Sequence, residues 1–158
     1  MGRVLSEAQL LEAVTAERAA GRTIALANGC FDLLHVGHVR YLQASSREAD
    51  RLVVAVNDDR SVADLKGPPQ PVLPAADRAE IVSAVRGVDY VVVFADRTVE
   101  RLLRALRPDV HCKGTDYTVE TVPERAVVLE YGGRTAIVGD PKRHNTRDLL
   151  ARIRATAP

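Results

Sequence analysis

The sequence has no tryptophan, one methionine and only two cysteines, and aromatic residues make up 4% of it. Cys30 and Cys112 lie far apart and form no CxxC pair, so a zinc site with the usual cysteine spacing is not predicted. No apolar run approaches the roughly 18 residues of a membrane span, and the N-terminal segment lacks the apolar centre of a signal peptide. We therefore expect a cytoplasmic protein with free thiols and no membrane partner.

Charge of one sign is also lacking, because 22 lysines and arginines face 21 aspartates and glutamates, for a formal net charge of +1. Such a chain has no general basic field to attract nucleic acid, and no nucleic-acid partner is predicted. Apolar residues make up 46% of the 158 residues, which is enough for a buried core. Without an internal repeat or a linker, the chain is expected to form a single domain over residues 1–158.

Apolar spacing predicts strands and helices that alternate along the chain. The capping pattern of Ser6 and Gln9 predicts a first helix that ends near Ala20, before Gly21. Strands are expected over five apolar segments: Thr23–Asn28, Arg51–Asn57, Asp89–Phe94, Asp109–Lys113 and Arg134–Val138. Helices are expected near residues 39–49, 75–85, 98–106 and 123–132, with a last helix capped by Asn145.

This alternation predicts an α/β fold with a five-stranded parallel sheet and helices on both of its faces. The segment Asp58–Pro74 is an exception, because Pro68, Pro69, Pro71 and Pro74 argue against a continuous element, and we expect a long loop there. Long loops inside compact domains are often functional. In sheets of this kind, ligands bind beyond the carboxyl ends of the strands, where the strand order reverses.

The segment Gly29–His38, with the sequence GCFDLLHVGH, lies between the first apolar strand and a helix. A helix N-terminus at such a turn offers backbone N–H groups and the positive end of a dipole, which attract phosphate. Gly29 and Gly37 allow the backbone to approach a ligand closely. His35 and His38 are three residues apart, so both imidazoles can face one ligand and donate to phosphoryl oxygens. The same spacing also suits a surface pair or two metal ligands.

This segment is similar to the GxFDxxHxGH signature of the cytidylyltransferase-like nucleotidyltransferases. Later pieces, VVAVNDDRSVADLKG, RAEIVSAVRGVDYVVVF and RPDVHCKGTDY, resemble in the same order the branch of that family that makes ADP-heptose from D-glycero-D-manno-heptose 1-phosphate. The resemblance extends from about residue 22 to residue 153. It implies a Rossmann-like, doubly wound sheet and an adenylyl transfer from ATP to a sugar 1-phosphate.

The resemblance also implies roles for individual residues. His35, His38 and Lys66 would act on the reacting phosphates, with Lys66 brought to them by closure of the long loop. Asp59 and Arg78 would hold the second substrate. The nucleotide would be bound by residues of the glycine turn, of the end of the fourth strand and of the start of the last helix: Gly29, Cys30, Phe31, Asp32, Gly37, Gly114, Asp116, Asn145 and Thr146.

Each of these assignments has a plainer alternative. Asp59 can be a turn residue, Lys66 a solvated lysine and Asp116 the residue of an Asx-turn. Arg78 lies at a helix start, where its charge is unfavourable to the helix dipole, which favours a function for it. Cys30 is expected to offer its backbone, because no base is placed to make it a nucleophile.

One departure from the family pattern concerns the phosphate-binding residues before the last helix. The family usually has a Ser-Thr-Thr type motif there, whereas this chain has Asn145, Thr146 and Arg147. Asn145 can still cap the helix and Thr146 keeps one hydroxyl group. The expectation is that both still contact phosphate.

The expected substrates are ATP and a sugar 1-phosphate, with Mg²⁺ bridging the triphosphate oxygens. Because Mg²⁺ uses few protein ligands in such sites, no protein metal ligand is predicted. The resemblance further implies a possible homodimer and a separate chain for the sugar kinase that precedes the reaction. The alternatives to this function are a cytidylyltransferase acting on glycerol 3-phosphate or a related polyol phosphate, a fragment of a class I aminoacyl-tRNA synthetase, and a nucleotide-binding module without activity.

Overall fold

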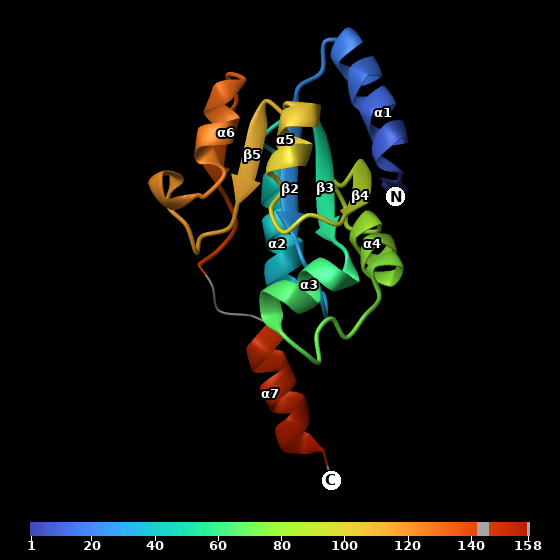
Figure 1. Ribbon diagram of the computed structural model, residues 1–158, viewed down its shortest axis with the longest axis vertical. Coiled ribbons are helices and arrows are strands. Elements are labelled where there is room, and N and C mark those ends of the chain that lie inside the picture. Colours follow the sequence, from blue (N-terminus) through green and yellow to red (C-terminus); the bar gives the residue numbers. More distant parts are fainter. Residues whose placement is uncertain (142–145, 158) are drawn as a thin grey trace.

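The computed structural model of the chain describes residues 1–141 and 146–157. Its sheet is parallel throughout, with six strands in the order β1-β4-β3-β2-β5-β6 and helices on both faces (Figure 1). The strands are β1 (Arg3–Val4), β2 (Ile24–Gly29), β3 (Arg51–Asn57), β4 (Tyr90–Phe94), β5 (Val110–Lys113) and β6 (Arg134–Ile137). The helices are α1 (Glu7–Ala19), α2 (Val36–Ser45), α3 (Asp59–Lys66), α4 (Ala75–Ser83), α5 (Glu100–Leu106), α6 (Arg125–Glu130) and α7 (Thr146–Thr156), with a 3₁₀ turn at Val119–Thr121.

The predicted α/β fold and its five strands are confirmed, but the strand count is wrong by one. The additional strand β1 has two residues and pairs in parallel with Tyr90 and Val91 of β4. Both of its residues are exposed, so they show no alternation of apolar and polar side chains. A strand this short leaves no periodic signal in a sequence.

The expectation of an irregular segment over Asp58–Pro74 is wrong for its first half. The prolines all follow Gly67, and α3 occupies the residues before it. Asp58 caps this helix, because its carboxylate accepts a hydrogen bond from the Ser61 N–H at 2.7 Å. Gly67 ends it with a φ of 74°, a left-handed value that glycine adopts without strain.

Both faces of the sheet are buried, which explains why the strands read as apolar runs. Along β2, Ile24 and Leu26 face a core completed by α1, α5 and α6, whereas Ala25 and Ala27 face a core completed by α2 and α4. Among the described residues, no helix has both the length and the apolar character needed to cross a membrane.

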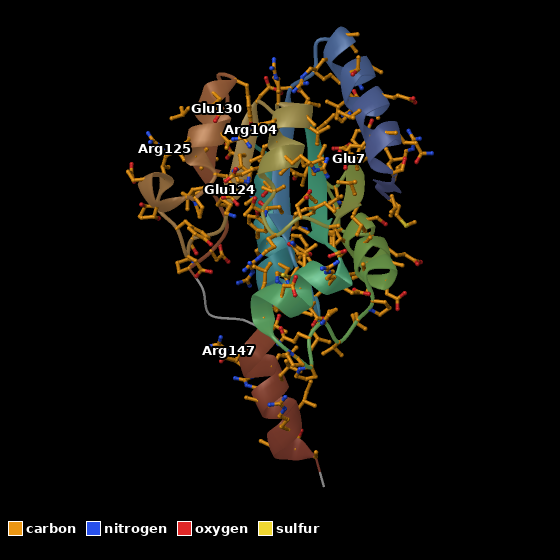
Figure 2. All side chains as sticks on the ribbon, viewed as in Figure 1. Glu7, Arg104, Glu124, Arg125, Glu130 and Arg147 are labelled. Carbon is orange, nitrogen blue, oxygen red and sulfur yellow. The ribbon has the colours of Figure 1, made fainter. Side chains whose placement is uncertain are left out.

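Helices α5 and α6 lie side by side over one face of the sheet (Figure 1). Figure 2 labels Arg104 on α5 and Glu130 on α6, whose side chains pair at 3.2 Å. Both side chains are about half exposed, so the pair adds little to stability. The two helices are held mainly by Leu102, Leu103 and Val128, which are fully buried.

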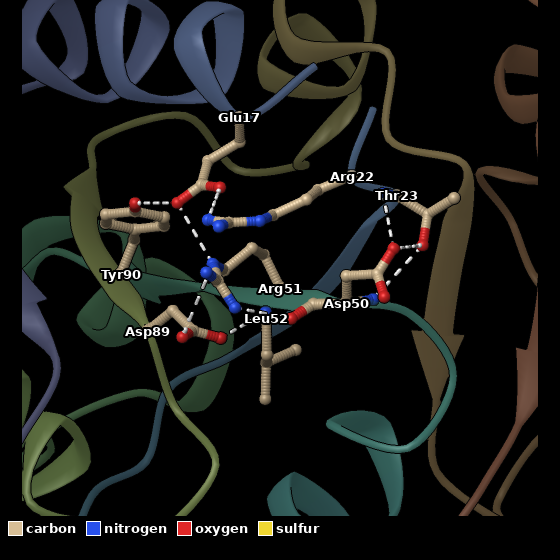
Figure 3. Close-up of polar contacts among 8 residues, drawn as sticks. All are labelled: Glu17, Arg22, Thr23, Asp50, Arg51, Leu52, Asp89 and Tyr90. Carbon is tan, nitrogen blue, oxygen red and sulfur yellow. Dashed lines mark hydrogen bonds and ion pairs between the residues drawn. The ribbon is translucent and has the colours of Figure 1, made fainter. Parts of the chain in front are cut away.

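At the amino ends of the strands, a polar network attaches α1 to the sheet (Figure 3). The Glu17 carboxylate accepts hydrogen bonds from the hydroxyl of Tyr90 at 2.6 Å, from Arg51 Nε at 2.9 Å and from Arg22 at 2.6 Å. These donors come from β4, from β3 and from the segment before β2. The network lies at the end of the sheet opposite to the ligand-binding edge, and we assign it a structural role.

The network predicts a pH dependence of stability. The hydrogen bond from Tyr90, followed by those from Arg51 and Arg22, lowers the pKa of Glu17 from 4.5 to about 2. A carboxyl group with a lowered pKa in the folded state stabilises the protein above pH 4.5, and this contribution is lost as the pH falls from 4.5 towards 2. Thermal unfolding of the wild type and of Glu17→Gln should therefore differ at pH 7 and converge near pH 2. A difference that is independent of pH would contradict this assignment.

Candidate active site

The candidate site is a pocket of about 420 Å³ at the carboxyl ends of β2 and β5. Strands β3 and β4 lie on one side of β2 and strands β5 and β6 on the other, so the strand order reverses between β2 and β5. This is the position that an open parallel sheet reserves for ligands. The pocket brings together ten of the predicted residues: Gly29, Cys30, Phe31, His35, Gly37, His38, Lys66, Gly114, Asp116 and Thr146.

The turn after β2 has an unusual backbone that is held by aromatic packing. Phe31 and Leu33 have φ values of 50° and 49°, a left-handed region that disfavours side chains with a Cβ. The buried Phe31 ring stacks on Tyr41 with centroids 6.5 Å apart and meets the edge of His38 at 5.4 Å. A Cβ on Gly29 would lie 3.2 Å from the Phe31 ring, so this position favours glycine. The ring thus fixes the turn that precedes the two histidines.

His35 and His38 stand at the start of α2 with their rings stacked 3.8 Å apart. His35 is the N-cap residue, and its Nδ1 accepts a hydrogen bond from the Gly37 N–H at 3.2 Å. His38 Nδ1 accepts from the His35 N–H at 3.4 Å. Each Nδ1 therefore acts as an acceptor, which places the proton of the neutral ring on Nε2. Both imidazoles line the pocket as Nε2–H donors, the form suited to phosphoryl oxygens.

Cationic side chains reach the pocket from two other elements. Lys66 is the last residue of α3, which differs from the loop position expected for it. Lys113 ends β5, where its ammonium group lies 3.4 Å from Glu124 Oε1 and 5.0 Å from the centre of the Tyr117 ring. The side chain of Lys113 is only 11% exposed, and that small exposed part contributes to the pocket wall. The pocket therefore offers fixed positive charge to an anionic ligand.

Ten lining residues were not predicted: Asn28, Arg40, Tyr41, Lys113, Thr115, Tyr117, Val138, Gly139, Asp140 and Pro141. Asn28 is the residue before the end of β2 and Lys113 ends β5, so the rule that ligands bind at the carboxyl ends of strands could have found them. Tyr41 stacks on Phe31, donates to the Cys112 carbonyl at 2.8 Å and also lines the pocket.

Cys30 lines the pocket next to the glycine turn. Burial raises the pKa of its thiol, although the charge of Lys66 acts in the opposite direction. The thiol donates to the Asn57 side-chain oxygen at 4.0 Å, which is a weak hydrogen bond because S–H is a weak donor. The thiol is therefore protonated at neutral pH, as expected for a residue that does not act as a nucleophile.

Asp32 does not line the pocket, in contrast to its expected contact with the nucleotide. It is fully buried, and its carboxylate accepts hydrogen bonds from the N–H groups of Val72 and Leu73 at 2.8 and 3.1 Å. Its backbone carbonyl accepts from the hydroxyl of Thr146 at 2.9 Å. Asp32 thus ties the turn after β2 to the proline-rich segment and to the start of α7. Asn145 lies outside the described residues.

Arg78 and Asp59 also lie outside the pocket wall. The fully buried guanidinium of Arg78 donates to the carbonyl oxygens of Cys30 at 2.5 Å, Asn57 at 2.7 Å and Leu73 at 2.9 Å. Its remaining nitrogen donates to the Asp59 carboxylate at 2.8 Å. All three nitrogens are therefore engaged within the protein, which differs from the expected contact with a substrate phosphate.

This arrangement predicts that Arg78→Lys mainly destabilises the fold. A lysine ammonium cannot reach all four acceptors, and each buried carbonyl left without its donor costs about 1–3 kcal/mol. Urea unfolding without substrate measures this loss, and Arg40→Lys is the control, because the pair of Arg40 with Asp140 is exposed and worth about 0.5 kcal/mol. A stable Arg78→Lys variant with a weakened apparent affinity for the phosphorylated substrate would instead make Arg78 a substrate contact.

Comparisons with known proteins agree with this geometry. The cytidylyltransferase-like family matches residues 26–153. The chain is 49% identical over 152 residues to the bifunctional protein HldE of Halorhodospira halophila and 44% identical over 144 residues to that of Syntrophotalea carbinolica. These matches cover 96% and 91% of this chain but 32% and 29% of those proteins, so the chain spans about a third of their length.

A solved structure has a similar fold. The lipopolysaccharide core biosynthesis protein from Thermoplasma volcanium GSS1 matches with a TM-score of 0.66 and 25% sequence identity. The match covers 77% of this chain and all of that one. Since the family match covers most of the chain and includes the strand, turn and helix that carry the histidines, the chain belongs to the cytidylyltransferase-like family of nucleotidyltransferases.

Proposed function

We propose that the chain transfers the adenylyl group of ATP to D-glycero-D-manno-heptose 1-phosphate, giving ADP-heptose and pyrophosphate. The proposal is supported by its similarity to the HldE proteins and to a lipopolysaccharide core biosynthesis protein. It is further supported by the order of the LKG, VDYVVVF and KGTDY segments along the chain. The cytidylyltransferase of polyol phosphates finds no comparable support.

One observation carries the chemical part of the proposal, namely the paired imidazoles of His35 and His38 at the start of α2. Both Nδ1 atoms accept backbone hydrogen bonds, which leaves Nε2–H as the donor of each ring. The helix N-terminus adds backbone N–H groups and the positive end of its dipole. Together these groups suit the charge that builds on a triphosphate as its α-phosphorus is attacked.

The reaction needs no covalent intermediate. An oxygen of the sugar 1-phosphate forms a bond to the α-phosphorus of ATP, while the bond from that phosphorus to the α–β bridging oxygen breaks. The electron pair of this bond leaves with pyrophosphate. Because the attacking phosphate is already ionised at neutral pH, no general base is required, and catalysis consists of positioning and charge stabilisation. In this scheme Lys66 and the two histidines stabilise the departing charge.

Magnesium fits this site as a partner of the nucleotide. Among residues 1–141 and 146–157, no group of three His, Cys, Asp or Glu side chains could hold a metal ion. Mg²⁺ typically uses one or two carboxylates together with substrate phosphates, and Asp116 and Asp140 line the pocket. When bound, the ion would neutralise part of the charge on the phosphates.

The proposed substrates also imply a setting for the reaction. A sugar 1-phosphate is the product of a phosphorylation, so we propose that a sugar kinase supplies it. We place the reaction in the cytoplasm, where ATP is available and where free thiols such as Cys30 and Cys112 persist.

The experiment that tests the proposed function measures pyrophosphate release for four nucleoside triphosphates, each combined with a panel of sugar 1-phosphates and with glycerol 3-phosphate. We expect the highest kcat/KM for ATP with the heptose 1-phosphate, by about tenfold or more over CTP, which corresponds to roughly 1.4 kcal/mol in transition-state binding. A tenfold preference for CTP, or for glycerol 3-phosphate as the acceptor, would overturn the assignment.

A further inference from the structure

A histidine outside the pocket wall contacts the pocket through a second residue. His111 lies in the middle of β5, beside β2, and is fully buried. Its Nε2 is 3.0 Å from the side-chain oxygen of Asn28, the residue next to the end of β2. Asn28 lines the pocket, whereas His111 does not. The contact therefore reaches from the interior of the sheet to the ligand-binding edge.

The protonation of the His111 ring follows from its surroundings. Burial, followed by the nearby charge of Lys113, lowers the pKa of His111 to about 3, so the ring is neutral at physiological pH. A neutral imidazole has one N–H group, and the Asn28 oxygen facing Nε2 requires a donor there. Nδ1 is then an acceptor, and it is buried without a hydrogen-bond partner among the described residues. The opposite tautomer would leave a buried N–H donor without a partner at Nδ1, and it would place two acceptors, Nε2 and the Asn28 oxygen, next to each other.

This contact determines which end of the Asn28 amide is available to a ligand. With its oxygen held by His111, the NH₂ group occupies the other arm of the carboxamide. Asn28 is half-buried and lines the pocket, and within the described part of the chain its NH₂ group has no hydrogen-bond acceptor, so this end of the amide is available to a ligand. Lys113, the neighbouring residue in the pocket wall, also offers only donors.

We infer that His111 is a positioning residue that holds the Asn28 carboxamide with its NH₂ group towards the pocket, where it donates to an oxygen of a bound substrate. The inference rests on the proposed function, in which both substrates carry phosphoryl and hydroxyl oxygens. Asn28 would then be a binding residue in addition to His35, His38 and Lys66. Because the amide is neutral, its hydrogen bond orients the substrate, while the positive charge of the lysines attracts the phosphoryl groups.

Two substitutions of His111 separate positioning from packing. The side-chain amide of glutamine reaches the position of Nε2 and can donate to Asn28, whereas asparagine is one methylene shorter and cannot. We expect His111→Gln to keep most of kcat/KM and His111→Asn to lose about three- to tenfold, chiefly through the KM of one substrate. Measuring KM for ATP and for the sugar 1-phosphate separately identifies which substrate Asn28 contacts. Equal effects of the two variants on kcat/KM, after thermal unfolding has shown both to be folded, would overturn the inference.

Substitutions of Asn28 test the direction of the amide. Asn28→Ala removes the donor and should lower kcat/KM by about ten- to a hundredfold, the effect of one hydrogen bond to a charged oxygen. Asn28→Asp keeps the oxygen that faces His111 but turns an oxygen towards the pocket, so it should be more damaging than Asn28→Ala. An Asn28→Asp variant more active than Asn28→Ala would mean that the pocket needs an acceptor at this position.

A measurement without turnover separates this inference from the proposed function. Long-range ¹H–¹⁵N NMR spectra of the full chain report which nitrogen of His111 carries its proton, and His111→Gln assigns the signal. We expect the proton on Nε2, with no titration of the ring between pH 5 and pH 8. A proton on Nδ1 would overturn the inference whatever the substrates are. A proton on Nε2 in a chain that does not use sugar 1-phosphates would support it while refuting the proposed function.

Discussion

A single buried guanidinium group connects the segments that form the candidate site. Arg78 donates to the carbonyl of Cys30 in the glycine turn, to that of Asn57 at the end of β3 and to that of Leu73 in the proline-rich segment. Its ion pair with Asp59 adds the first turn of α3, the helix that carries Lys66 at its other end. The planar fork of arginine is suited to such a set of acceptors. The position of Lys66 relative to the histidine turn therefore depends on a residue that does not line the pocket.

The site itself combines contributions from both sides of β2. The turn after β2 and the start of α2 supply the two histidines, and the end of β5 supplies Lys113 and Gly114. Asp32 adds a second internal connection, because it binds the N–H groups of Val72 and Leu73. Buried polar groups with satisfied hydrogen bonds thus hold the loops, which leaves the imidazoles and Lys66 to act on the ligand.

Sequence patterns predicted the fold and half of the residues that line the pocket, since strand ends, capping residues and the spacing of His35 and His38 are local features. They missed β1, which is too short for periodicity, and α3, because the four prolines that argue against a helix all lie after Gly67, beyond the end of α3. The burial of Arg78 was not predictable, since its partners are mainly backbone carbonyls distant in sequence. The contact of His111 with Asn28 was not predictable for the same reason, because it depends on the register in which β2 and β5 pair.

If the imidazoles stabilise charge through Nε2–H while Nδ1 accepts a backbone hydrogen bond, then His35→Asn separates these two roles. The asparagine amide can replace Nδ1 as the cap of α2 but has no group at the position of Nε2. We expect a melting temperature close to that of the wild type and a kcat lowered by about 10²-fold, the effect of losing one preorganised donor. A His35→Asn variant that keeps near-normal kcat would contradict it.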